Sequence, residues 1–230
     1  PYTREITTKF LLAAVTRIYE PGAKFDNMLT LVGNQGEGKS SIFMLLAGIE
    51  WFNTIETVEG KESCEVLDGK WIIEMAELKA VRRAERESIK GYISRQVDTY
   101  RKAYAKNVED YPRQCVFVGT TNDREFLTDK TGGRRFWVVE TRKENATKNM
   151  WTDLNKSNSF ERDMIWAEIM DLYKTGGINI NTLSEDSEEV ALKMQEAYSE
   201  GNTLSGMLEA FLEIKIPEDW YKLSLAERVN

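Results

Sequence analysis

The chain of 230 residues contains no histidine, only two cysteines and no long hydrophobic run. The lack of histidine excludes Ser-His-Asp triads and zinc sites with histidine ligands, so any metal must be held by oxygen ligands, which suits Mg²⁺. Cys64 and Cys115 predict two reduced thiols in a cytoplasmic protein. No stretch of about 18 apolar residues could span a membrane, and no secretory signal opens the chain. Because the first residue is Pro1 instead of Met and the segment after it has the pattern of folded protein, we expect a piece of a longer protein.

The charge of the chain is unevenly distributed. Its net charge is -7, yet residues 181–230 hold 11 acidic and 4 basic residues while residues 1–180 are neutral. Residues 79–106 carry nine basic side chains against three acidic ones: Lys79, Arg82, Arg83, Arg86, Lys90, Arg95, Arg101, Lys102 and Lys106. Such an excess either attracts a polyanion or covers a solvated helix face, and the sequence leaves both interpretations open.

Apolar residues recur at helical or strand spacing along most of the chain. We expect helices at residues 9–19, 39–48 and 83–94, and a mostly helical region from about 150. We expect strands at 28–32, 54–58, 71–77, 115–119 and 136–139, and a hairpin at 97–108. Apolar strands separated by helices predict an α/β fold with a mainly parallel sheet covered on both faces. The expected divisions are a helical segment (1–27), a core (28–145) and a helical C-terminal subdomain (146–230), acidic after 181 and interpreted there as a separate lid or subdomain.

A glycine-rich loop follows the first expected strand. It matches the P-loop pattern G-x-x-x-x-G-K-S/T in full, and a strand before it and a helix after it are the context that this motif requires. Its backbone N–H groups would surround the phosphates of ATP, with Lys39 on the β- and γ-phosphates and the Ser40 hydroxyl on Mg²⁺. The expected phosphate-binding residues are Gly33, Asn34, Gln35, Gly36, Glu37, Gly38, Lys39, Ser40 and Ser41.

Polar side chains stand beside three further expected strands. Glu74 and Glu77 are the two candidates for holding the Mg²⁺ shell or polarising the attacking water, and the alternative for each is a surface carboxylate. Glu77 ends the strand 71–77 and is the favoured base, while Glu74 lies deeper and would touch the metal through water. Asn122 follows the strand 115–119 and either positions the attacking water or turns the chain. Arg134 and Arg135 follow two glycines and form either an arginine finger or an exposed basic turn.

The order of these parts resembles that of the AAA+-like superfamily-three helicase ATPases of viruses and mobile elements. It is more closely similar to the virulence-associated protein E family of prophages and pathogenicity islands. The segments that carry the likeness are 33–40 (GNQGEGKS), 67–78 (LDGKWIIEMAEL), 94–101 (SRQVDTYR), 112–122 (PRQCVFVGTTN) and 132–137 (GGRRFW).

The resemblance implies an AAA+/ASCE-like P-loop NTPase and assigns roles by matching position. The implied roles are Walker A for Lys39 and Ser40, catalytic acid for Glu77, sensor 1 for Asn122, and a finger acting on the neighbouring subunit for Arg134 or Arg135. One position departs from the pattern, since Ala76 stands where a second acid is typical. Magnesium binding then rests on Ser40 and water, or on Glu74.

The resemblance also implies a hairpin that contacts DNA in the pore of a ring. Lys102 and Lys106 would follow the phosphates, and Tyr100 or Tyr104 would stack on bases. The implied function is an ATP-hydrolysing motor for DNA, most readily single-stranded, in replication of a phage or mobile element. We expect a homo-oligomeric ring, with a hexamer as one candidate, and count a primase-like domain or other replication proteins among its partners. The alternatives are a regulatory ATP switch or loader and, more weakly, a small-molecule kinase.

Overall fold

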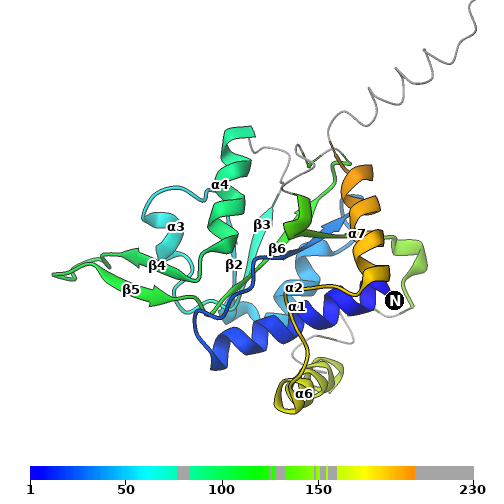
Figure 1. Cartoon of the computed structure of the whole chain (residues 1–230), viewed down its shortest axis with the longest axis horizontal. Helices are drawn as coiled ribbons and strands as arrows, with labels where there is room; N and C mark the ends of the chain where they lie inside the picture. The colour runs from blue at the N-terminus through cyan, green and yellow to red at the C-terminus, as the bar shows by residue number, and fades with distance from the viewer. Residues whose placement is uncertain are drawn as a thin grey trace, which may run out of the picture.

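A parallel β-sheet forms the centre of the molecule in a computed structural model (Figure 1). The structure describes residues 1–76, 83–124, 126–127, 133–147, 149–150, 154 and 160–199, with the backbone alone at 83–87 and 145. Within these residues the sheet has the order β2-β3-β6-β1-β7, and all four pairings are parallel. Its strands are β1 (Met28–Val32), β2 (Phe52–Ile55), β3 (Ile72–Ala76), β6 (Val116–Thr121) and β7 (Phe136–Glu140).

Helices cover both faces of this sheet. The helices are α1 (Tyr2–Tyr19), α2 (Lys39–Ala47), α3 (Glu62–Glu65), α4 (Arg83–Ser94), α6 (Phe160–Thr175) and α7 (Glu185–Ala197), with short 3-10 turns η1 (Ile49–Trp51), η3 (Gly133–Arg135) and η4 (Lys143–Asn145). Successive strand residues point to opposite faces, so an apolar strand supplies two cores. Phe117 packs with α4 on one face, whereas Val116 and Val118 pack with α1, α2 and α6 on the other. The expected α/β architecture is confirmed.

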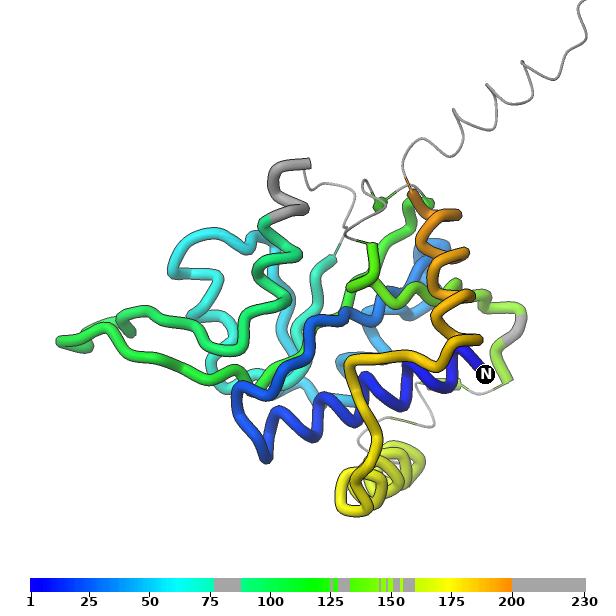
Figure 2. Tube along the Cα trace, in the orientation of Figure 1, coloured from blue at the N-terminus to red at the C-terminus, as the bar shows by residue number. Residues whose placement is uncertain are grey.

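The C-terminal helices share this core. Ile169 of α6 and Ala191 of α7 are both 4% exposed and belong to the same cluster as Phe10 of α1. Tyr198, directly after α7, joins the core on the α4 face. The described part of the acidic region therefore packs on the sheet, and Figure 2 shows α7 lying along the body of the molecule.

Several expected boundaries differ from the structure. Helix α1 begins at Tyr2 instead of residue 9 because Tyr2 and Ile6 continue its buried face by two turns. Strand β2 covers Phe52–Ile55 instead of 54–58, since its pairing with β3 begins opposite Ile72. The hairpin consists of β4 (Val97–Tyr100) and β5 (Glu109–Pro112), so most of the expected segment 97–108 is its connecting loop.

A buried arginine joins the first helix to the sheet. The Arg17 side chain is 0% exposed and donates hydrogen bonds to the carbonyls of Ala23 (3.0 Å), Phe25 (2.8 Å) and Cys115 (2.6 Å). Burial lowers the pKa of Arg17 to about 10, which leaves it charged at neutral pH. Three carbonyl partners compensate for the lost hydration of the charge, and they fix the end of α1 against the segments that lead into β1 and β6. None of the described helices is long and apolar enough to cross a membrane.

Candidate active site

The glycine-rich loop joins the carboxyl end of β1 to the start of α2, as expected. Gly36 and Gly38 have φ angles of 82° and 81°, and the Gly38 conformation is left-handed where α2 begins. Residues that carry a side chain rarely adopt such positive backbone φ angles, so the chain needs glycine at both positions. The first turn of α2 then presents backbone N–H groups to the loop, which is the arrangement that binds anions at helix N-termini.

Lys39 lies folded into this loop. Its ammonium group donates to the carbonyl oxygens of Gly33 (2.9 Å) and Asn34 (2.7 Å). The positive charge is therefore held within the turn whose backbone would surround a phosphate group.

A buried carboxylate connects the start of α2 to the middle of the sheet. Oε1 of Glu74 accepts hydrogen bonds from the hydroxyls of Ser40 (2.6 Å) and Thr120 (2.5 Å). Glu74 is 3% exposed and Thr120 is 5% exposed. Glu74 faces α2 because it alternates along β3 with Ile73 and Met75, which face α4. This arrangement places two oxygen-bearing side chains of the expected metal site, Ser40 and Glu74, in direct contact.

The oxygen groups at this point suit a hard divalent cation such as Mg²⁺, which binds through few protein ligands and keeps several waters. Among the described residues, no group of three or more acidic or cysteine side chains gathers to hold a metal. Glu77, the favoured base, lies outside the described residues, as does Gly132.

The loop is also braced against the end of β7. The Glu37 carboxylate accepts hydrogen bonds from the Thr141 hydroxyl (2.5 Å) and the Asn34 amide (3.3 Å). The hydrogen bond from Thr141 lowers the pKa of Glu37. A side chain at Gly33 would collide with these groups, because its Cβ would lie 2.1 Å from the Thr141 hydroxyl. Thr141 belongs to no recognisable sequence motif, and the sequence analysis did not identify it.

Asn122 lies beside the same loop. It directly follows β6, where Thr121 is level with Val32 of β1, and the Gly33 N–H donates to the Thr121 carbonyl (3.2 Å). The Asn122 side chain is exposed. The structure thus gathers Lys39, Ser40 and Asn122 at the carboxyl ends of the strands, with Glu74 just below them in β3.

The two candidate finger arginines lie at the opposite edge. They precede β7, whose first residue Phe136 pairs with Met28 at the start of β1. The glycine-rich loop follows the other end of β1, five residues further, or roughly 17 Å along the strand at about 3.3 Å per residue. Arg134 is exposed, whereas Arg135 is half-buried and its Nε donates to the Ser94 hydroxyl (2.9 Å). Neither arginine is part of the group around this chain's own loop.

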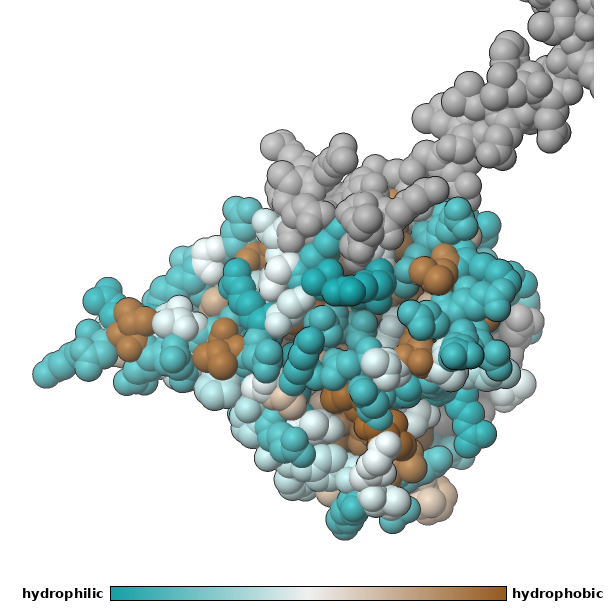
Figure 3. Space-filling model, in the orientation of Figure 1, coloured by the Kyte–Doolittle hydropathy of each residue, from teal (hydrophilic) through white to brown (hydrophobic). Residues whose placement is uncertain are grey.

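The hairpin projects from the body and is mostly hydrophilic (Figure 3). Tyr104 is fully exposed in its connecting loop, and Lys106 is exposed nearby. Tyr100 is 7% exposed and packs on the Tyr111 ring, with 4.6 Å between the ring centroids. Lys102 forms an ion pair with Asp68 (2.6 Å). Of the four residues expected to contact nucleic acid, only Tyr104 and Lys106 are exposed and have no side-chain partner among the described residues; burial makes the Tyr100 ring unavailable to a base.

The basic run 79–106 does not form one described surface. Lys79 and Arg82 lie outside the described residues, and the side chains of Arg83 and Arg86 are not described. Lys90 is 8% exposed, while Arg95 lies over the Tyr92 ring at 5.3 Å from its centroid.

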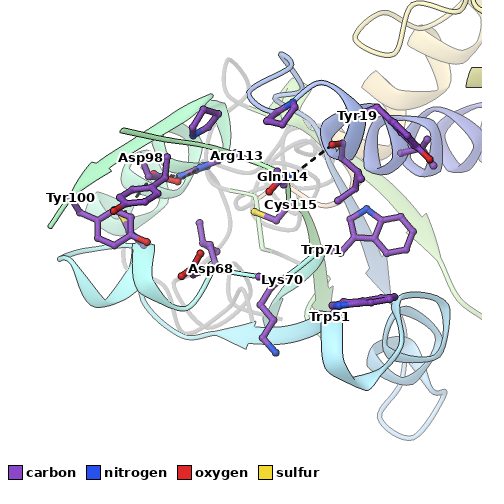
Figure 4. A pocket seen from close by; sticks show the side chains of 18 of the residues that line it. Tyr19, Trp51, Asp68, Lys70, Trp71, Asp98, Tyr100, Arg113, Gln114 and Cys115 are labelled. Atoms are coloured by element: carbon purple, nitrogen blue, oxygen red, sulfur yellow. Dashed lines mark hydrogen bonds and ion pairs between the residues drawn. The ribbon is translucent and has the colours of Figure 1, made fainter. Parts of the chain in front are cut away.

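A cavity of about 780 Å³ lies at the amino edge of the sheet, away from the loop (Figure 4). Trp51, Trp71 and Tyr19 line its apolar part. Its polar lining groups are largely paired internally: the Trp71 indole N–H donates to the Ala14 carbonyl (2.8 Å), and Arg113 donates to Asp98 (2.6 Å). The cavity therefore offers few free polar groups to a ligand, and it is not part of the group at the loop.

A protein-family model, that of the virulence-associated protein E-like domain, matches residues 1–200 of this chain. This chain belongs to that family. The resemblance seen in the sequence is thereby confirmed. No match is found among curated proteins.

Solved structures extend the comparison of this virulence-associated protein E-like chain. The A form apo structure of the NrS-1 C-terminal region is similar with a TM-score of 0.53 and 16% identity, covering 99% of this chain. A second structure of that region has a TM-score of 0.45 and 17% identity, again covering 99% of this chain. This chain spans 62% of the length of each. At this identity the first likeness establishes a shared fold alone.

Proposed function

We propose that this domain binds ATP at residues 33–41 and hydrolyses it. The observation that carries the proposal is the contact between Ser40, in the phosphate-loop motif, and the buried Glu74 carboxylate. Burying a charged group in a central strand costs free energy unless the charge is paired and hydrogen-bonded. Here the carboxylate meets the hydroxyl that the motif assigns to magnesium.

The residues present fit ATP and Mg²⁺. The helix N-terminus and Lys39 supply positive charge for the phosphates, Ser40 and Glu74 supply oxygens for the cation shell, and Asn122 is placed to orient water. Mg²⁺, when bound, neutralises charge on the phosphoryl group that is transferred. Glu77 keeps the proposed role of base, and the strand order, with β6 between β1 and β3, supports an AAA+/ASCE-like P-loop ATPase.

We further propose that hydrolysis requires a homo-oligomeric ring. Arg134 and Arg135 lie at the sheet edge opposite this chain's own loop. An arginine there is suited to serve the loop of a neighbouring copy, where it would stabilise charge in the transition state.

The biological role that fits best is a DNA motor in the replication of a phage or mobile element. Membership of the virulence-associated protein E-like family supports this role. The projecting hairpin, with Tyr104 and Lys106 exposed, provides one aromatic ring and one charge for single-stranded DNA.

A regulatory ATP switch that does not move along DNA is the second candidate. The hairpin favours this candidate, because two of its four expected DNA contacts are already engaged within the chain: Tyr100 is buried and Lys102 is paired with Asp68. A small-molecule kinase gains no support, since the described cavity of about 780 Å³ lies away from the loop.

The test measures ATP hydrolysis with and without single-stranded DNA and compares the wild type with the Lys39→Ala and Arg135→Ala variants. The motor requires activity that rises with DNA and falls at least about 100-fold in both variants. Activity that depends on Lys39 but is indifferent to DNA would favour the switch. Wild-type protein that neither binds nor hydrolyses ATP would refute both.

A further inference from the structure

The hydroxyl of Ser94, the last residue of α4, is held between two partners. It donates to the Lys90 carbonyl (2.9 Å) and accepts from Nε of Arg135 (2.9 Å). A serine hydroxyl has one proton. Because the Lys90 carbonyl takes that proton, the oxygen lone pairs are turned toward Arg135.

This contact restrains the Arg135 guanidinium at its Nε atom. Nε is engaged, and the two terminal nitrogens, which have no hydrogen-bond partner among the described residues, remain for a bidentate grip on an anion. Among the described residues, Ser94 is the side chain that Arg135 contacts, while the exposed Arg134 has no such contact. Of the two candidates, Arg135 is therefore the one with a defined orientation.

The same helical turn also holds the base of the hairpin. Arg113, just before β6, donates to the Tyr92 carbonyl and forms a two-pronged ion pair with Asp98 of β4, at 2.6 and 2.7 Å. Both members of the pair are buried, Arg113 at 3% and Asp98 at 5% exposure. The last turn of α4 thus contacts the hairpin base at Tyr92 and the arginine at Ser94.

We propose that Ser94 is a positioning residue for Arg135 and that the last turn of α4 links this arginine to the hairpin. A displacement of the hairpin base is transmitted through Arg113 and Tyr92 to the end of α4. It then changes the direction of the guanidinium. The inference rests on the proposed function, in which Arg135 acts on ATP held by a neighbouring copy.

The experiment measures ATP hydrolysis with single-stranded DNA in Ser94→Ala and Ser94→Thr. The loss of a hydrogen bond to a charged group predicts a rate about tenfold lower in Ser94→Ala, whereas Ser94→Thr keeps the oxygen and most of the rate. Thr16→Val is the matched control, because Thr16 makes the same bond to the carbonyl four residues back in α1 (2.8 Å) and, among the described residues, its hydroxyl accepts no hydrogen bond from an arginine side chain. Its rate should equal that of wild type.

A mixing experiment separates a misplaced finger from a damaged fold. Lys39→Ala subunits lack a working loop but carry an intact Arg135, so mixing them with Ser94→Ala subunits should give more activity than the two measured separately. Full activity of Ser94→Ala alone, or low activity that mixing does not raise, would overturn the inference. Failure of the proposed function looks different: wild type would be inactive, or Arg135→Ala would be fully active.

Discussion

Replacing Glu74 with glutamine removes one negative charge from the middle of the sheet and keeps the shape of the side chain. The carboxylate is 3% exposed and accepts two hydroxyl hydrogen bonds, both at Oε1. A hydrogen bond to a charged group contributes about 1.5–3 kcal/mol and a neutral one about 0.5–1.5, so glutamine loses roughly 2 kcal/mol over two bonds. Burying the charge of Glu74 costs several kcal/mol in the folded state, and the neutral glutamine avoids this cost, which offsets the loss. The free energy of unfolding should therefore fall by no more than about 1 kcal/mol.

Activity should respond differently from stability. Glu74 orients the Ser40 hydroxyl, and loss of such an outer partner typically costs about 10–100-fold in metal affinity or rate. We expect Glu74→Gln to require more MgCl₂ for half-maximal ATP hydrolysis and to turn over more slowly. The assays are hydrolysis across a MgCl₂ series and urea unfolding of the same preparations.

Thr120→Val is the matched control for this prediction. It removes the second donor to Glu74 and retains the charge, so it should lower stability by about 1–3 kcal/mol and leave the MgCl₂ dependence close to that of wild type. An unchanged MgCl₂ dependence in Glu74→Gln, or a loss of activity no greater than the loss of folded protein, would refute the role assigned to Glu74.

Two further predictions concern the hairpin and the docking of α7. Tyr104→Ala combined with Lys106→Ala should abolish stimulation of hydrolysis by single-stranded DNA and weaken DNA binding by about 1–3 kcal/mol for the lost stacking, measured by fluorescence anisotropy, while unchanged DNA binding would exclude the hairpin tip. Burial alone would raise the pKa of Glu5, but hydrogen bonds from Lys9 and Ser184 outweigh it and lower this pKa from 4.5 to about 2. Because the folded-state pKa is depressed, the contribution of Glu5 to stability is present above pH 4.5 and is lost as the pH falls toward 2. Thermal unfolding should therefore show a difference between wild type and Glu5→Gln that is constant at neutral pH and shrinks below pH 4.5, and a pH-independent difference would contradict this.

Much of the fold could be predicted because its strands are buried on both faces. The strand 28–32 and the helix 83–94 have the predicted bounds, since unbroken apolar or periodic runs specify them locally. The start of α1 was missed because polar residues separate Tyr2 and Ile6 from the clearer pattern that begins at residue 9. Strand β2 depends on its partner β3, and a partner cannot be read from a four-residue strand.

The sequence specified the candidate site firmly at the local motif and left alternatives open elsewhere. The loop pattern identifies Lys39 and Ser40 by spacing, whereas Glu74 could not be distinguished from a surface carboxylate. Its role depends on Thr120 and Ser40, which lie 46 and 34 residues away in the chain. Thr141 lies 104 residues from the Glu37 it contacts, and nothing in the sequence near either residue indicates that contact.

The arrangement of the sheet gives a reason why one copy would not suffice for the proposed reaction. In a parallel sheet every strand presents its carboxyl end at one edge, and residues 33–41 and Asn122 gather there, with Glu74 just below them in β3. Arg135 precedes a strand of the same sheet, so it lies at the other edge, level with the start of β1. It cannot reach the loop of its own chain without the sheet coming apart. Under the proposed function Arg135 therefore serves a second copy, and an Arg135→Ala variant should regain hydrolysis when mixed with Lys39→Ala subunits.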